Sequence, residues 1–290
     1  MTNIDQFESA FKAASKAVFA YAPVEVRSVL VVTDLADAAA VFAGHARRLL
    51  GVLERGMLAG GQTLEFEVVR GSGFRTVGEL LEVVERAACD LVCTYRNLHS
   101  TAWQWPHSLG VHLDVLTQAT GVPVLVLPHP LAGTDLADSI GGTGSVMAIP
   151  DHLTGDHRLV NYAVALTEPE GRLYLTHVED EATFDRYIET ISKVPTIDTD
   201  EAREAILKQL LKEPRDYIRS CREVLGQQGV AVQVEKIVTL GHHLSDYRRL
   251  IDEHRVDLLV VNTKDEDQLA MHGLAYPLSV ELRSTPILML

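Results

Sequence analysis

Apolar runs without alternation are the main pattern along this chain. Short runs such as VLVV, VPVLVL and LLVV show no polar residue at every second position, which is typical of strands buried on both faces of a parallel sheet. The stretches between them carry apolar residues at helical spacing, for example Val77, Leu80, Leu81 and Val84. The pattern predicts an alternating α/β fold.

The same plan occurs twice. From Asp90 to Leu127, and again from Asp257 to Leu290, an Asp-Leu pair opens an apolar run, and a polar loop, a Gly, a helix-like stretch, a Pro and a second apolar run follow. In both copies the Pro comes thirteen positions after the Gly, as in Gly110 and Pro123. This internal repeat predicts two modules of similar design.

The two modules are not equal in content. We predict a first module at 1–128, a linker rich in Gly, Asp and small residues at 129–143, and a second module at 144–290. The second module has room for a strand, RLYLTHV, that has no counterpart in the first. The first module is therefore predicted to be a reduced form.

Two helical segments have unusual features. An extra N-terminal helix is predicted to cover the sheet exposed by the missing strand, with one apolar face formed by Ile4, Phe7, Phe11, Ala14 and Val18. In the second module, the helical segment from Asp200 to Leu225 contains Pro214, which is expected to end or kink the helix.

Composition and charge narrow the class of protein. The net charge is −14 and the basic residues are scattered among acidic ones, so nucleic acid and anionic membrane surfaces are not expected partners. No apolar run approaches the ~18 residues of a membrane span, so no membrane insertion is expected. Cys89, Cys93 and Cys221 are odd in number and form no CxxC, which indicates buried, inert thiols in a cytoplasmic protein.

The order of these motifs resembles the universal stress protein family. It comprises a strand ending in Asp, an apolar strand leading to Gly, the Asp-Leu strand, and the Gly thirteen positions before the Pro of the last strand. The resemblance covers about 27–128 and 144–290, and it implies two Rossmann-like (adenine nucleotide α-hydrolase-like) parallel-sheet modules. In many members ATP or another adenine nucleotide binds at the carboxyl ends of the strands.

The resemblance also implies pairing between final strands. We expect Val122–Leu127 and Pro286–Leu290 to pair within the chain, because this would protect two apolar edge strands. A homodimer is compatible with this arrangement.

The loops that would hold phosphate depart from the family pattern. In ATP-binding relatives the loop reads Gly-x2-Gly, nine residues, then Gly-Ser/Thr, whereas neither loop here has the Gly pair, and Val111 or Leu274 follows the remaining Gly. Asp265, Glu266 and Asp267 stand where a triphosphate would lie, and like charges repel. We therefore expect no cofactor, with ATP or another adenine nucleotide in module two as the alternative.

The resemblance indicates six candidate binding residues for a modified ligand. They follow strand ends or belong to the loop after the fourth strand: Asp34, Asp151, Val178, Asn262, Thr263 and Gly273. The alternative interpretation is that the aspartates cap helices and the polar loop residues face water.

Metal chemistry has weaker support. Two histidine pairs, one of them His152 and His157, lie five positions apart, which does not place two imidazoles on one helix face, and no HExxH occurs. His242 and His243 are expected to start a helix. A metal site would need Asp151, His152, His242 and His243 to converge at one sheet edge, so we expect no metal.

Catalytic motifs are absent from the sequence. The stretch Gly71-Ser72-Gly73 fails as a dinucleotide fingerprint because its third glycine is misplaced, and no Walker loop or GxSxG occurs. Trp103 and Trp105 form either a recognition surface or part of the core. We predict a non-enzymatic stress-response or regulatory protein that binds an unknown protein partner or small ligand, with an adenine-nucleotide-binding switch or weak ATPase as the alternative.

Overall fold

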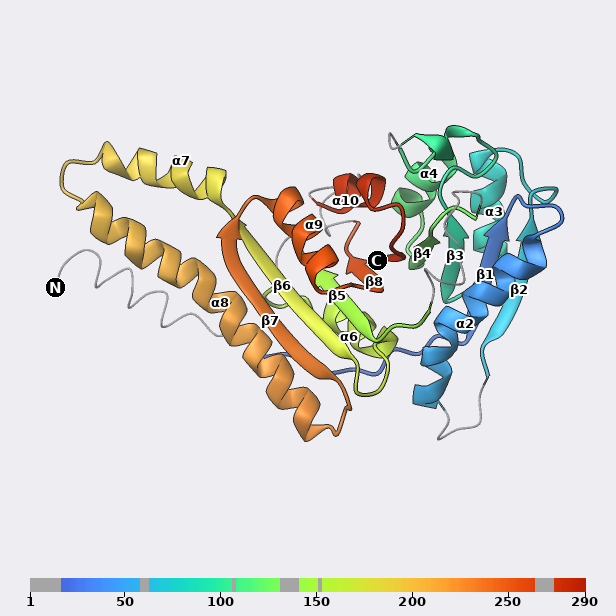
Figure 1. Cartoon of the computed structure of the whole chain (residues 1–290), viewed down its shortest axis with the longest axis horizontal. Coiled ribbons are helices and arrows are strands. Elements are labelled where there is room, and N and C mark those ends of the chain that lie inside the picture. The colour runs from blue at the N-terminus through green and yellow to red at the C-terminus, as the bar shows by residue number, and fades with distance from the viewer. Residues whose placement is uncertain (1–16, 58–62, 106–107, 131–140, 151–152, 264–273) are drawn as a thin grey trace.

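One sheet runs through the whole molecule (Figure 1). The computed structural model describes residues 17–57, 63–105, 108–130, 141–150, 153–263 and 274–290. Its nine strands follow the order β2-β1-β3-β4-β9-β8-β5-β6-β7. All neighbouring strands are parallel except β4 and β9. The predicted α/β class is confirmed.

The strands and helices alternate along the chain. The strands are β1 (Ser28–Thr33), β2 (Glu65–Arg70), β3 (Leu91–Tyr95), β4 (Val124–Leu127), β5 (Ser145–Ile149), β6 (Arg172–Asp180), β7 (Gln233–Gly241), β8 (Leu258–Val261) and β9 (Ile287–Met289). The helices are α2 (Ala39–Met57), α3 (Val77–Ala87), α4 (Val111–Ala119), α6 (His157–Leu166), α7 (Glu181–Ser192), α8 (Thr199–Gln227), α9 (His243–Glu253) and α10 (Ala275–Glu281).

Local sequence explains several of these elements. Every residue of β3, β4 and β8 is buried, as expected of strands at the centre of a covered sheet. Thr76 caps the N-terminus of helix α3: its side chain accepts from the Glu79 N–H, while the Glu79 side chain accepts from the Thr76 N–H. This capping box satisfies two backbone donors that the first turn leaves unpaired.

The two halves of the sheet meet at their last strands. Strand β9 lies between β8, to which it is parallel, and β4, to which it is antiparallel. The register joins Val124 to Met289, Leu125 to Leu288 and Val126 to Ile287. The expected pairing of the two final strands is confirmed.

The N-terminal half is smaller than the C-terminal half. We use "N-terminal half" for β1–β4 with α2–α4, and "C-terminal half" for β5–β9 with α6–α10. Among the described residues the N-terminal half contributes four strands to the sheet and the C-terminal half five. Strand β2 pairs with β1 as β6 pairs with β5, so the strand without a counterpart by position is the edge strand β7, and the prediction that RLYLTHV, in β6, has none is wrong. The first module is therefore reduced, as predicted. The boundaries 1–128, 129–143 and 144–290 stay a prediction, because 131–140 lies outside the described residues.

The chain before β1 lies against the C-terminal half. Residues 1–16, which carry most of the predicted N-terminal helix, are outside the described part. Residues 17–27 are not helical, and the Val18 side chain is 63% exposed, so the prediction is wrong for Val18. The Phe19 N–H donates to Ser220 Oγ of α8 at 3.0 Å. Residues 17–27 are thus held by contacts with the C-terminal half. The periodicity of the sequence carries no information about such contacts.

Helix α8 runs through Pro214 without interruption. It forms an antiparallel pair with α7, and both extend beyond the end of the sheet (Figure 1). Of the two outcomes expected at Pro214, an end of the helix is wrong, and a kink stays a prediction. Leu211, Pro214, Tyr217 and Ile218 are all buried. Burial of this face stabilises the helix enough to offset the one hydrogen bond that proline removes.

Two further expectations concern cysteines and membranes. Cys89, Cys93 and Cys221 are buried and unpaired with one another, as predicted. Among the described residues, no helix combines the length and the apolar character that crossing a membrane demands.

Candidate functional site

The carboxyl ends of β1 and β3 meet at a hydrogen-bond network that is partly buried. The Tyr95 hydroxyl donates to the Asp34 carboxylate and lies 3.0 Å from the Thr33 hydroxyl. The Asp34 N–H donates to the Tyr95 oxygen at 2.9 Å, and the His99 N–H donates to Asp34 Oδ2 at 2.8 Å. Burial, followed by the bond to Asp34, raises the pKa of Tyr95. Asp34 therefore closes the strand end and does not cap α2.

Aromatic rings fill the space beside this network. The Phe74 ring lies 4.9 Å from the His99 ring and 5.9 Å from the His112 ring, measured between centroids. At Gly71 a Cβ would come within 2.8 Å of the His99 ring, so this close approach requires glycine. The strand-end crevice of the N-terminal half is thus occupied by the protein's own side chains.

The equivalent point in the C-terminal half is built on Asn262. Its side-chain amide donates to Asp156 Oδ2 at 2.5 Å, while Asp156 Oδ1 accepts from the Leu159 N–H at 2.9 Å and caps α6. Burial raises the pKa of Asp156. An amide and an acid here replace the Tyr95–Asp34 pair of the other half.

The backbone of Val178 in β6 is bonded to side chains of α9. The Val178 N–H donates to the Tyr247 hydroxyl at 3.2 Å, and the Val178 carbonyl lies 2.7 Å from His243 Nε2. Both backbone groups that a ligand would use at this candidate position are therefore engaged within the protein.

The other candidate residues lie elsewhere. Thr263 is 3% exposed, and its hydroxyl lies 2.8 Å from the Leu290 carbonyl and 3.3 Å from the Thr117 carbonyl. It belongs to the junction between the halves and not to the crevice. Asp151 and Gly273 are outside the described residues, as is the acidic group at 265–267.

Histidine positions favour structural roles. His243 begins α9 directly after His242, so the expected helix start is confirmed. His112 Nε2 lies 3.2 Å from the Arg75 carbonyl, and His157 Nδ1 lies 2.9 Å from the Tyr217 hydroxyl. Within the part of the chain that the structure describes, no group of three or more metal-ligating side chains comes together.

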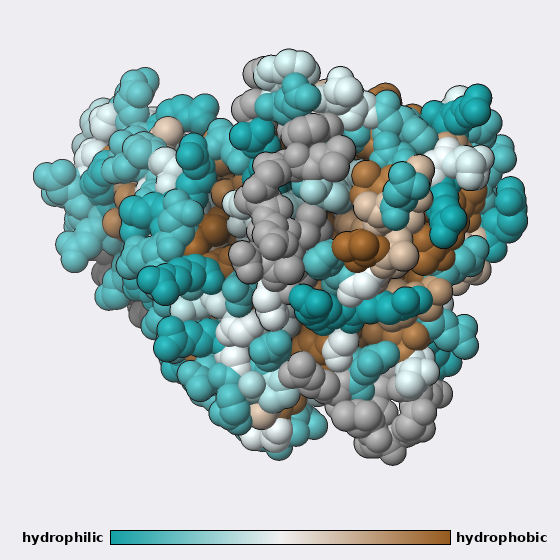
Figure 2. Space-filling view, turned by 45° about the vertical axis from the view of Figure 1, so that its right-hand side comes forward, coloured by the Kyte–Doolittle hydropathy of each residue, from teal (hydrophilic) through white to brown (hydrophobic). Residues whose placement is uncertain are grey.

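The surface around Trp105 keeps both interpretations of the tryptophans open. Figure 2 shows separate hydrophobic patches among hydrophilic side chains on one face of the molecule. The Trp105 side chain is 54% exposed, which a recognition surface requires. The side chain of Trp103 is not described.

Sequence reasoning missed the partners of the candidate residues. Tyr95 and Asn262 occupy the same place in the repeat, five positions after Asp90 and Asp257, and this correspondence was available in the sequence. Asp156 stands directly before a helical stretch, where aspartate commonly caps. The bonds from Tyr247 and His243 had no such signal.

Solved structures share this architecture. A protein from Pseudomonas aeruginosa UCBPP-PA14, named as a candidate universal stress protein, superposes over 91% of this chain and 93% of its own, with a TM-score of 0.51 and 12% identity. The fold is that of the universal stress proteins. No protein-family profile matches the sequence, and no curated protein matches it.

Two more solved structures are similar to this chain over most of its length. A functionally unknown protein from Pseudomonas aeruginosa PAO1 covers 91% of this chain and 92% of its own, with a TM-score of 0.51 and 12% identity. A universal stress protein from Archaeoglobus fulgidus DSM 4304 covers 92% and 98%, with a TM-score of 0.49 and 13% identity. In such open sheets the carboxyl strand ends are the usual ligand position, and here internal side chains occupy much of it.

Proposed function

We propose that this chain is a non-enzymatic, cytoplasmic stress-response or regulatory protein of the universal stress protein type. It binds a protein partner or a small ligand and does not load ATP in the family's usual way. The observation that carries the proposal is the Val178 backbone, whose N–H and carbonyl are already bonded to Tyr247 and His243. A nucleotide base at this point would have to displace both side chains.

The N-terminal half supports the same proposal. The Tyr95–Asp34 network and the Phe74 and His99 rings occupy its strand ends. A ligand there would have to break the part-buried hydrogen bond between Tyr95 and Asp34 and displace the aromatic rings.

The cysteines support a non-enzymatic role. All three thiols are buried, and burial raises the pKa of Cys89, Cys93 and Cys221. Thiols in such surroundings stay protonated and unreactive, and they persist unpaired in a reducing compartment.

Nucleotide loading can be tested directly. We expect native mass spectrometry of the untreated protein to show no co-purified nucleotide. Thermal unfolding with ATP and Mg²⁺ should shift the midpoint by less than about 1 °C, because a ligand stabilises only a state that it binds. Co-purified adenine nucleotide, or a shift of several degrees, would overturn the proposal in favour of a nucleotide-binding switch.

A variant tests the Val178 argument itself. His243→Ala combined with Tyr247→Phe frees both backbone groups of Val178. We expect this variant to gain a measurable ATP-dependent shift relative to its own nucleotide-free midpoint. Tyr187→Phe is the matched control, since Tyr187 is 57% exposed. If the double variant responds to ATP no more than the control, Val178 does not explain the lack of loading.

A further inference from the structure

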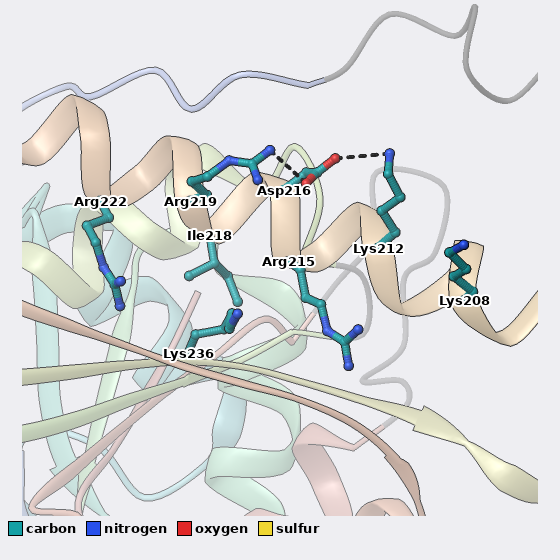
Figure 3. A pocket seen from close by; sticks show the side chains of 8 residues that line it. All are labelled: Lys208, Lys212, Arg215, Asp216, Ile218, Arg219, Arg222 and Lys236. Atoms are coloured by element: carbon teal, nitrogen blue, oxygen red, sulfur yellow. Dashed lines mark hydrogen bonds and ion pairs between the residues drawn. The ribbon is translucent and has the colours of Figure 1, made fainter.

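A strongly basic pocket lies between α8 and the edge strand β7 (Figure 3). Its volume is about 410 Å³. One acidic side chain, Asp216, and one apolar side chain, Ile218, line it together with six basic residues: Lys208, Lys212, Arg215, Arg219, Arg222 and Lys236. Such a concentration of positive charge stands out in a chain whose net charge is −14.

The sequence of α8 places the cations in a row. Four of them each follow a buried residue by one position: Leu211–Lys212, Pro214–Arg215, Ile218–Arg219 and Cys221–Arg222. Steps of three and four residues keep side chains on one side of a helix. The row therefore follows the flank of α8 next to its buried face.

Only part of this charge is balanced. Asp216 pairs with Lys212 at 3.2 Å and with Arg219 at 2.7 Å. Arg215, Arg222 and Lys236 form no ion pair with any carboxylate among the described residues. The pocket thus contains uncompensated cations, whose mutual repulsion a bound anion would relieve.

The uncompensated side chains lie in a row along the gap between helix and strand. Figure 3 shows Arg215 and Arg222 pointing from α8 towards the strand, Lys236 pointing from β7 towards the helix, and Ile218 between them. The Arg222 guanidinium donates to the Val234 carbonyl of β7 at 2.6 Å, which holds it in place. Helix and strand together build the site.

We propose that this pocket binds a small molecule with a chain of two or more linked phosphate groups. A volume of about 410 Å³ lies in the range of small-molecule sites. One guanidinium group can donate two parallel hydrogen bonds to the oxygens of one phosphate group. Arg215 and Arg222 are seven residues apart, or ~10 Å along the helix, which is more than one phosphate group covers.

This site is separate from the strand-end crevice. Lys236 lies five residues before Gly241, the carboxyl end of β7, which is ~17 Å along a strand. The proposal does not rest on the proposed function, but ATP bound here would also raise the unfolding midpoint of the parent protein. The ATP thermal-shift measurement is therefore repeated on the Arg215→Gln Lys236→Gln variant: a shift that this variant loses belongs to the pocket, and one that it keeps belongs to the strand-end crevice.

Calorimetry with inorganic tripolyphosphate tests the pocket. At low ionic strength we expect one molecule bound per chain, with weaker binding as salt is added. Arg215→Gln and Lys236→Gln should each weaken binding about tenfold, the effect of losing one charge-assisted hydrogen bond. Within the described part of the chain, the side chains of Arg215 and Lys236 make no hydrogen bond or ion pair on which the fold depends. Arg203→Gln is the matched control on the same helix, since Arg203 lies outside the pocket and pairs with Asp185 at 2.9 Å.

Further ligands identify the source of the phosphate chain. If ATP displaces tripolyphosphate from the parent protein and does not bind the Arg215→Gln Lys236→Gln variant, the site also accepts nucleoside polyphosphates. If ATP does not displace tripolyphosphate, the site accepts inorganic chains only. The proposal is overturned if tripolyphosphate does not bind, or if it binds the double variant as tightly as the parent protein. A polyglutamate peptide that binds as tightly as tripolyphosphate would also overturn it, because the pocket would then be a surface for acidic protein segments.

Discussion

Asp90 and Asp257 stand at the same place in the repeat and accept hydrogen bonds from the backbone of a neighbouring strand, but their pKa values are shifted in opposite directions. Asp90 Oδ2 accepts the Arg27 and Ser28 N–H groups at 2.8 and 2.9 Å, and Asp257 Oδ2 accepts the Ser145 N–H at 2.8 Å. Each carboxylate thereby ties the start of a half's first strand to the strand beside it, β1 to β3 and β5 to β8. Burial raises the pKa of both, but at Asp90 the hydrogen bonds outweigh burial and the pKa is lowered.

Asp90→Asn should therefore lower stability in a pH-dependent way. A carboxyl whose folded pKa lies below its unfolded value of 3.8 stabilises the fold above that value and loses this effect as pH falls through the folded pKa. We expect a loss of about 1 kcal/mol at pH 7, which begins to shrink as the pH falls below 3.8 and disappears below the folded pKa. Urea unfolding across this range measures it, and a loss that stays constant with pH would contradict the charge argument.

Asp257→Asn is the matched comparison. Burial, with a contribution from Glu168, raises the pKa of Asp257, so the native protein binds the proton more tightly than the unfolded chain does. Stability from this group falls as pH rises above the unfolded value of 3.8. Asparagine keeps an acceptor for the Ser145 N–H without the charge, so unfolding at pH 7 should show no loss or a small gain. A loss as large as that of Asp90→Asn would contradict this assignment.

At the scale of elements, Pro214 is the least expected feature. A proline in a helix interior costs ~3 kcal/mol relative to alanine, because it removes a hydrogen bond and crowds the preceding turn. Here the cost is offset by burial of the α8 face that contains it.

Pro214→Ala should stabilise the protein by about 1 kcal/mol. The helix regains its hydrogen bond, and the loss of part of a buried side chain offsets some of the gain. Urea unfolding measures the change. Pro195→Ala, in the turn between α7 and α8, is the control and should bring no gain. If Pro214→Ala lowers stability, the proline shape itself is required in α8.

Arg96 connects an element of one half to the other. Its side chain is 2% exposed and donates to the carbonyls of Leu282 at 2.9 Å and Val280 at 3.4 Å, at the C-terminal end of α10. Burial, with a contribution from Arg283, lowers its pKa to about 10. A cation is favourable at this end of a helix, so the residue after β3 fixes the last helix of the C-terminal half.

Arg96→Met should cost about 2 kcal/mol. It leaves two carbonyl groups without their donor while keeping most of the apolar stem. Chemical denaturation measures the loss, and Arg283→Met is the control because Arg283 is nearby and exposed. Equal stability of the two variants would show that Arg96 does not hold α10.

At the scale of the molecule, β9 makes one sheet out of two halves. Leu288 is fully buried and is in register with Leu125 of β4 and Val260 of β8. Since β9 lies between the halves, the apolar core is continuous across them. A continuous core favours unfolding as one cooperative unit.

Leu288→Ala should therefore destabilise both halves together, by about 3 kcal/mol. Both tryptophans lie in the N-terminal half, so their fluorescence reports that half while far-UV circular dichroism reports the whole chain. We expect both signals to shift equally towards lower urea in this variant, and Val115→Ala, at a position 36% exposed, to shift neither. Fluorescence that keeps its parent midpoint while dichroism shifts would show that the halves unfold independently.

The sequence by itself determined the order of elements and their doubling. Apolar runs, helical spacing and the Gly to Pro interval are local patterns, and they were enough to predict the α/β class, the smaller size of the N-terminal half and the pairing of β4 with β9. The burial of Cys89, Cys93 and Cys221 was also predicted, and the structure confirms it. Local patterns suffice here because strands and helices are selected mainly by the residues they contain.

Only the tertiary structure decided what the candidate site contains. Tyr95 reaches Asp34 across 61 positions and Tyr247 reaches Val178 across 69, as different elements bring them together. Packing of distant elements also brings the Phe19 N–H to Ser220 of α8. It likewise places Lys236 of β7 opposite Arg215 and Arg222 of α8. Such contacts depend on how elements pack, and no spacing along one element reports them.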